Sequence, residues 1–159
     1  MQSTQTLTLI DHENLSKGMT RTSEGTHTKR LRLQLAMEPL LRGLLGDLGR
    51  VVVGSSFSGP DFMDTMACFP GRQCIYEEGA DGAERALIGH LEKHYSYGEI
   101  SELIIASGDG IFVETARAWK ARGTKIIVVS ARGSLSHELR DLADEVHVLP
   151  SNWHYDFAA

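Results

Sequence analysis

Residues 6–15, "TLTLIDHENL", join a run of strand-forming side chains to a group of polar ones. The spacing predicts a β-strand over residues 6–10 that ends at Asp11. A strand that ends there delivers the Asp11 carboxylate to its carboxyl end, where open α/β sheets bind their ligands. Capping of a turn or helix is the alternative role for Asp11, because Asp and Asn side chains often bond nearby backbone amides. This stretch alone leaves both roles open.

Similar short apolar runs recur along the chain and alternate with segments whose apolar residues lie three or four positions apart. Further strands are predicted at residues 50–56, 72–78, 102–108, 125–131 and 145–150. Helices are predicted at residues 27–48, 60–69, 81–95, 111–123 and 134–143. Strict alternation of strand and helix predicts an α/β fold, in which helices cover both faces of a mainly parallel sheet. The expected architecture is therefore a three-layer α/β/α sandwich.

The length of 159 residues suits one domain, which we expect to span residues 1–159 with its core at about 6–150 and a short C-terminal tail. Cys68 and Cys74 lack the spacing of a metal site or a disulfide framework, so reduced thiols are expected. The first residues lack the pattern of a signal peptide, and no run approaches the roughly 18 apolar residues of a membrane span. These features predict a cytoplasmic protein without a membrane partner.

Charge is unevenly distributed along the chain. The formal net charge of -5 argues against a generally basic surface that would bind nucleic acid. Residues 16–32, in contrast, carry five basic side chains against one acid: Lys17, Arg21, Lys29, Arg30 and Arg32 against Glu24. Such a segment is expected to be a poorly ordered arm that contacts phosphates, and a solvated loop leading into a helix is the alternative.

Acidic residues follow three of the predicted elements at the carboxyl edge of the sheet. Asp11 follows the first strand, Asp81 stands at the start of a predicted helix, and Asp109 follows the fourth strand. Any one of them alone would be read as a helix cap. Three carboxylates that converge repel one another, and a divalent cation that binds their oxygens offsets this cost. Mg²⁺ or Mn²⁺ fits such an oxygen-rich site.

Three polar neighbours fit the same site. The amide of Asn14 can hold a carboxylate or a phosphate, and Ser107 adds a hydroxyl group. Glu84 lies one helical turn after Asp81 on the same face, where a solvated helix residue is the alternative reading. Neither a P-loop nor a GxSxG nucleophile motif occurs in the chain, which disfavours P-loop nucleotide binding and serine acyl hydrolysis.

Three ordered motifs resemble the NYN-domain family of PIN-like nucleases: "LIDHENL" at 9–15, "EGADGAERAL" at 78–87 and "ASGDGIF" at 106–112. The resemblance implies a Rossmann-like sheet of strand order 3-2-1-4-5. It also implies that acids gather around one or more divalent metals and that the protein processes or degrades RNA. The positions that match the family's motifs are Asp11, Asn14, Asp81, Asp109, Ser107 and Gly108.

The chain departs from the family pattern at three positions. Ile111 replaces a second aspartate of the third motif, Glu78 replaces a lysine, and Leu87 replaces an acid often found further along the same helix. Fewer metal ligands therefore remain. Either Glu13, Glu78 or Glu84 supplies a carboxylate from a neighbouring position, or the site binds metal weakly.

The leading hypothesis is a metal-dependent ribonuclease. Its metal ligands would be Asp11, Asp81, Asp109 and Glu84, with Asn14 and Ser107 orienting ligands, and RNA phosphates would contact Lys17, Arg21, Lys29 and Arg30. The second hypothesis is a non-catalytic module that binds RNA or a protein, and the third is a small-molecule phosphohydrolase or nucleotide binder. The sequence leaves the RNA target and self-association open.

Overall fold

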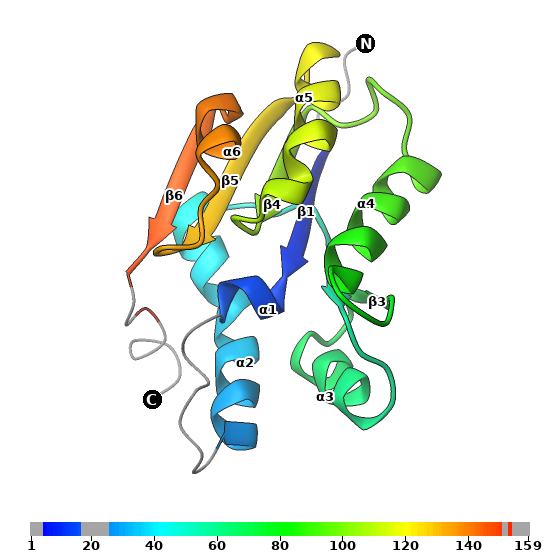
Figure 1. Cartoon of the computed structure of the whole chain (residues 1–159), viewed down its shortest axis with the longest axis vertical. Coiled ribbons are helices and arrows are strands. Elements are labelled where there is room, and N and C mark those ends of the chain that lie inside the picture. The colour runs from blue at the N-terminus through cyan, green and yellow to red at the C-terminus, as the bar shows by residue number, and fades with distance from the viewer. Residues whose placement is uncertain (1–4, 17–25, 151–152, 154–159) are drawn as a thin grey trace.

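A single parallel sheet forms the centre of the protein (Figure 1). The computed structural model describes residues 5–16, 26–150 and 153. Its six strands have the order β3-β2-β1-β4-β5-β6, so the predicted order 3-2-1-4-5 is confirmed and a sixth strand extends it beside β5. The strands are β1 (Thr6–Asp11), β2 (Arg50–Ser55), β3 (Gln73–Tyr76), β4 (Glu102–Ala106), β5 (Lys125–Ala131) and β6 (Glu145–Leu149).

Helices cover both faces of this sheet, as the alternating pattern predicts. They are α1 (His12–Leu15), α2 (Thr26–Leu45), α3 (Pro60–Cys68), α4 (Gly82–His94), η1 (Gly110–Phe112), α5 (Val113–Ala121) and α6 (His137–Leu142), where η1 is a short 3-10 helix. Apolar residues of α2 and α3 pack on one face, and those of α4, α5 and α6 pack on the other. Figure 1 shows α5 and α6 in front of the sheet and the end of α2 behind it.

The alternation of side chains along β1 sends its residues into the two cores in turn. Leu7 and Leu9 enter the core under α4 and α5, whereas Ile10 enters the core under α2. Parallel neighbours on both sides place Leu9 opposite Val52 of β2 and Ile105 of β4. A strand buried on both faces is expected to be apolar along its length, which the TLTLI run provides.

The close approach of α4 to β2 brings the start of that helix to the carboxyl edge of the sheet. Gly54 makes this possible, because a Cβ atom there would lie 2.6 Å from Cγ of Leu87 and 2.8 Å from the carbonyl oxygen of Ala83. Any larger residue would push the two elements apart. The glycine therefore sets the position of the polar residues in the first turn of α4.

Three details differ from the sequence-based expectations. The expected arm of residues 16–32 overlaps the helix predicted at 27–48, and the structure places its residues from Thr26 onward in α2. The short helix α1 was not expected, since four residues are too few to show a helical period. Trp153, in the predicted C-terminal tail, is 2% exposed and packs in the core under α2.

No helix within the described residues combines the length and the hydropathy that a bilayer crossing requires.

Candidate functional site

Of the two roles that the sequence left open for Asp11, the structure shows the capping role. The Asp11 side chain is 0% exposed and caps α1, because Oδ1 accepts a hydrogen bond from the backbone N–H of Asn14 at 3.3 Å. Its other oxygen, Oδ2, accepts a hydrogen bond from the Ser107 hydroxyl at 2.9 Å. The Ser107 oxygen in turn accepts a bond from the N–H of Asp109 at 3.3 Å. The ends of β1 and β4 are thus joined by side-chain hydrogen bonds.

Asp11 also contacts Glu84 in the first turn of α4. The pKa of Asp11 is raised to about 8, first by burial and then by the nearby Glu84 side chain. The hydrogen bonds from Ser107 and Asn14 lower this pKa and only partly offset the effect. Two carboxyl groups that lie close together in a buried place repel each other when both are ionised, and a cation bound beside them offsets that cost.

Three carboxylates gather in front of this pair. Asp81, Glu84 and Asp109 each offer an oxygen, and these oxygens all lie within 4.8 Å of one another. Asp81 is exposed and Asp109 is half-buried, whereas Glu84 is only 9% exposed. We call Asp81, Glu84 and Asp109 the acidic cluster; Asp11 lies behind it and reaches it through Glu84 and Ser107.

The backbone of Asp81 adopts an unusual conformation that a helix cap does not require. Its φ and ψ are 58° and 21°, the left-handed region, and its side chain makes no capping hydrogen bond to α4. Among the described residues that are not glycine, Asp81 is the one with a positive φ. Such a conformation costs on the order of 1 kcal/mol and is common at functional sites. Asp109, in contrast, caps η1 through Oδ1, which accepts from the N–H of Ile111 at 3.0 Å.

Asn14 fixes the loop that follows β4. Its Oδ1 accepts a hydrogen bond from the N–H of Gly108 at 3.0 Å, and its side chain is almost buried. Gly108 is needed for a second reason, because a Cβ atom there would lie 2.2 Å from the Ser130 hydroxyl and 2.4 Å from the Ser134 carbonyl oxygen. The end of β4 is therefore held between α1 and the loop after β5.

The structure distinguishes among the three glutamates that were candidates for a missing ligand. Glu84 belongs to the acidic cluster. The carboxylate of Glu13 instead accepts hydrogen bonds from the N–H and hydroxyl of Ser56, at 2.7 and 2.6 Å. Glu78 is exposed and accepts a hydrogen bond from the Ser58 hydroxyl.

Two of the departures from the family pattern are part of the apolar core. Leu87 is 0% exposed and contacts the β2 backbone at Gly54. Ile111 is half-buried and packs against the core under α4 and α5. A carboxylate at either position would lose its hydration on burial, which costs free energy, whereas an apolar side chain does not carry this cost.

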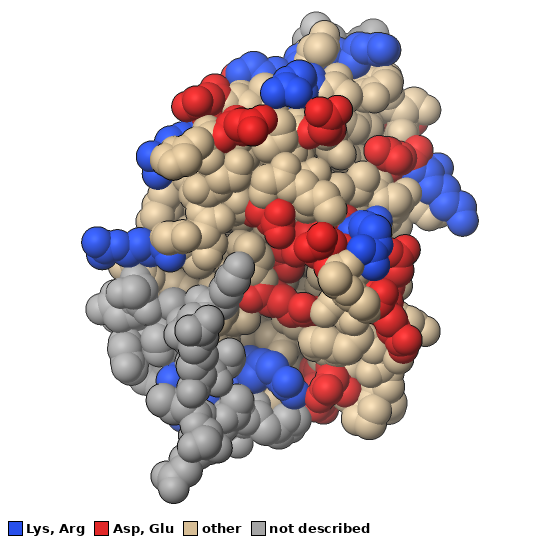
Figure 2. All heavy atoms as spheres, viewed as in Figure 1, with Lys and Arg blue, Asp and Glu red and all other residues tan. Residues whose placement is uncertain are grey.

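The predicted basic contacts are only partly described. Lys29 and Arg30 lie near the start of α2, where Arg30 forms an ion pair of 2.9 Å with Asp61 of α3. Lys17 and Arg21 lie outside the described residues. Figure 2 shows acidic side chains gathered in the middle of one face, with basic side chains below them.

An open hollow of about 280 Å³ adjoins the acidic cluster, and sequence reasoning did not identify it. It shares Asp109 with the cluster and extends to the loop between β5 and α6. The described lining residues are Asn14, Gly108, Asp109, Gly110, Gly133, Ser134, Leu135 and Ser136. The signal in the sequence was the small, polar run "GSLS" at 133–136, directly after a predicted strand and hence at the same carboxyl edge.

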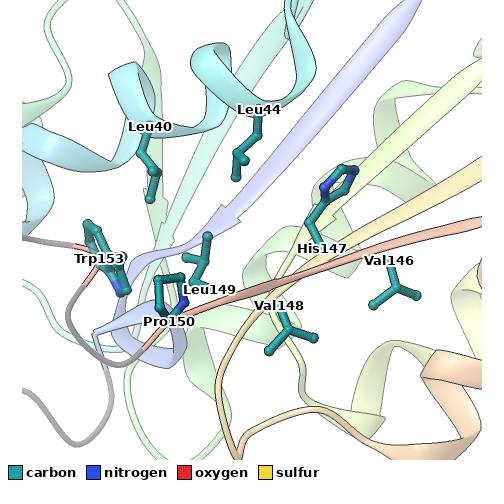
Figure 3. A pocket seen from close by; sticks show the side chains of 8 residues that line it. All are labelled: Leu40, Leu44, Val146, His147, Val148, Leu149, Pro150 and Trp153. Carbon is teal, nitrogen blue, oxygen red and sulfur yellow. The ribbon is translucent and has the colours of Figure 1, made fainter. Parts of the chain in front are cut away.

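A second hollow, of about 350 Å³, lies between α2 and the edge strand β6. Figure 3 shows its lining side chains, which are largely apolar and include Leu40, Leu149 and Trp153. Among the described lining residues, His147 is the one with a titratable side chain. Its Nε2 lies 2.7 Å from Oε1 of Glu145, to which it is hydrogen-bonded. This hollow shares no described residue with the acidic cluster.

Comparison with known proteins identifies a family and a similarity in fold. The family model described as NYN domain matches residues 69–150, just over half of the chain. A crystal structure of a protein of unknown function from Vibrio parahaemolyticus is similar in fold, with a TM-score of 0.62 and 14% sequence identity over 94% of each chain. No curated protein matches the chain.

Proposed function

Because the chain belongs to the NYN domain family of PIN-like nucleases, we propose that it is a divalent-metal-dependent ribonuclease that hydrolyses RNA phosphodiester bonds. The observation that supports this proposal best is the acidic cluster, in which oxygens of Asp81, Glu84 and Asp109 lie within 4.8 Å of one another. We further propose that residues 1–159 act as one domain, with the acidic cluster as its catalytic centre.

The donor set fits a hard divalent cation. All three members of the cluster offer carboxylate oxygens, which Mg²⁺ and Mn²⁺ prefer to nitrogen or sulfur ligands. Asp81, Glu84 and Asp109 would hold the ion. When bound, such an ion polarises a phosphate oxygen and lowers the pKa of a bound water.

Asp11 acts on the cluster from behind. Asp11 lies next to Glu84, and a cation bound at the cluster would favour the ionised form of the Asp11 carboxyl group. The Ser107 hydroxyl, bonded to Asp11 and to the N–H of Asp109, keeps the ends of β1 and β4 in register. Asn14 holds the following residue, Gly108, in place. These three residues therefore position the carboxylates and the loop that carries Asp109.

The proposed contacts between basic residues and RNA phosphates rest on the distribution of charge along the chain. Lys29 and Arg30, with Lys17 and Arg21 from the preceding segment, concentrate positive charge that would attract a polyanion to an otherwise acidic protein. Cys68 and Cys74 are free thiols, which suits a reducing compartment, and on this ground we propose a cytoplasmic location.

The test is cleavage of a single-stranded RNA by the purified protein in Mn²⁺, in Mg²⁺ and in EDTA. We expect cleavage with either metal and none in EDTA. Glu84→Gln should reduce the rate at least about 100-fold, because a neutral amide removes one anionic ligand of the metal. Glu92→Gln is the matched control, since Glu92 is an exposed residue of the same helix outside the cluster, and its rate should equal that of the wild type.

Each other outcome has a defined meaning. Cleavage that persists in EDTA would contradict metal dependence. If RNA binds equally well in Mn²⁺ and in EDTA and is not cleaved, the protein is an RNA-binding module rather than a ribonuclease. Turnover of a nucleotide but not of RNA would indicate a small-molecule phosphohydrolase.

A further inference from the structure

The hollow beside the acidic cluster contains a hydrogen-bond donor without a partner. Asn14 lines the hollow and is 7% exposed. Its Oδ1 is occupied by the N–H of Gly108 at 3.0 Å, which fixes the orientation of the amide. Within the described residues, its Nδ2 makes no hydrogen bond. Nδ2 is also not among the buried side-chain atoms of the described residues that lack a partner, so it is open to solvent and can donate to an acceptor of a ligand in the hollow.

The rest of the lining offers small, neutral polar groups. Gly110 and Gly133 add no side chain, and Ser134 and Ser136 add hydroxyls that both donate and accept. Among the described lining residues, Asp109 is the one charged side chain. A phosphate in the hollow would therefore face a carboxylate, whereas a hydroxyl group of a ligand can donate to that carboxylate.

The size and position of the hollow also limit its occupant. Its volume of about 280 Å³ lies just below the range of small-molecule pockets, which begins at about 300 Å³, so a single sugar fits better than a larger ligand. Asp109 belongs to both the hollow and the acidic cluster, so their occupants must be neighbours. In RNA, the covalent neighbour of a phosphate is a ribose.

We propose that this hollow is a ribose subsite, in which the Asn14 amide and the serine hydroxyls recognise the 2′-hydroxyl of a nucleotide that flanks the scissile phosphate. The proposal rests on the ribonuclease function proposed above and adds the means by which RNA is chosen over DNA. A bound deoxyribose would cover the Asn14 amide and leave it without an acceptor, and a site built to bond a hydroxyl rejects the analogue that lacks it.

The experiment uses one single-stranded RNA and a set of strands in which a single 2′-deoxynucleotide replaces each position in turn. Initial cleavage rates are measured in Mn²⁺. We expect a decrease of about tenfold when the deoxynucleotide occupies one position next to the cleaved bond, equivalent to about 1.4 kcal/mol. Equal rates at every position, with cleavage intact, would overturn the ribose subsite and leave the ribonuclease proposal standing.

A variant that narrows the hollow provides the second arm. A Cβ atom on Gly110 would lie 3.3 Å from the Ser136 hydroxyl oxygen, close enough to reduce the space without a severe clash. Gly110→Ala should therefore lower the tenfold discrimination to about twofold or less. Gly89→Ala is the control, because no atom lies within 4 Å of a Cβ atom there, and it should keep the full discrimination. Thermal melts check that both variants fold.

If the protein cleaves none of the strands, the ribonuclease proposal is contradicted. A binding measurement then tests whether the hollow is a ribose subsite. Fluorescence anisotropy in Mg²⁺ compares the RNA strand with the DNA strand of the same sequence. RNA bound about tenfold more tightly by the wild type, with the difference lost in Gly110→Ala, would support the ribose subsite. Equal affinities would overturn it.

Discussion

Replacement of His12 by glutamine should remove a large part of the acid sensitivity of the fold. His12 is 1% exposed, and its Nε2 lies 2.8 Å from the hydroxyl oxygen of Ser55. Burial, and to a smaller extent the charge of Arg30, lower the pKa of this imidazole from 6.5 to about 4. Glutamine keeps an amide that can bond Ser55 and does not titrate.

The direction of the effect follows from proton binding. Between pH 6.5 and about 4 the unfolded chain protonates His12 while the folded protein does not. The free energy of unfolding therefore rises with pH across this window and is lost as the pH falls through it. At about 1.4 kcal/mol for each pH unit, the loss is about 3 kcal/mol.

Urea unfolding at several pH values between 7.5 and 4, in EDTA, measures this difference. The wild type should lose about 3 kcal/mol more than His12→Gln over the window. Asp11, whose pKa is raised, favours folding at low pH in both proteins, so the comparison cancels its contribution. The exposed His137 is the control, and His137→Gln should follow the wild type. Parallel curves for the wild type and His12→Gln would refute the reasoning.

Three further substitutions test the site and its support. Asp109→Asn should abolish metal-dependent cleavage with an unchanged melting temperature, because the remaining oxygen can still accept the bond from Ile111; residual metal-dependent cleavage would remove Asp109 from the proposed ligands. Ile111→Asp should lower the free energy of unfolding, measured by urea titration, by about 1–3 kcal/mol, because the new carboxylate enters a half-buried apolar place. Higher affinity of this variant for Mn²⁺ would instead show that a carboxylate at position 111 joins the site. Gly54→Ala should lower the free energy of unfolding by about 1–3 kcal/mol through overpacking and should weaken the thermal stabilisation by Mn²⁺. Gly43→Ala, with open space around its Cβ position, should do neither. Equal melting temperatures of the two alanine variants would mean that α4 can shift freely.

The sheet could be predicted because its signal is local. Each strand is a short apolar run, and parallel strands buried on both faces need little more than such runs and the helices between them. The strand β3 is shorter at both ends than predicted, Gln73–Tyr76 instead of residues 72–78, since edge strands are weakly specified by sequence. The order of the strands came from the family resemblance.

The site could be predicted only in part, because its details depend on contacts between distant residues. The spacing of Asp81 and Glu84 placed both carboxylates on one face of a helix, and the structure puts them in one cluster. The burial of Asp11 behind Glu84 could not be read from sequence, since it depends on how closely α4 approaches β2. The hollow was missed for the same reason: its walls come from Asn14 and a loop at 133–136.

The left-handed backbone of Asp81 has a consequence for protein engineering. Glycine adopts a φ of 58° without steric cost, so Asp81→Gly would relax the turn before α4. A library selected for thermal tolerance alone would therefore enrich this substitution and delete one of the three clustered carboxylates. Selection for cleavage would retain the aspartate. At this position thermal stability and the proposed cleavage favour different amino acids, so a thermostable redesign of the protein should hold Asp81 fixed.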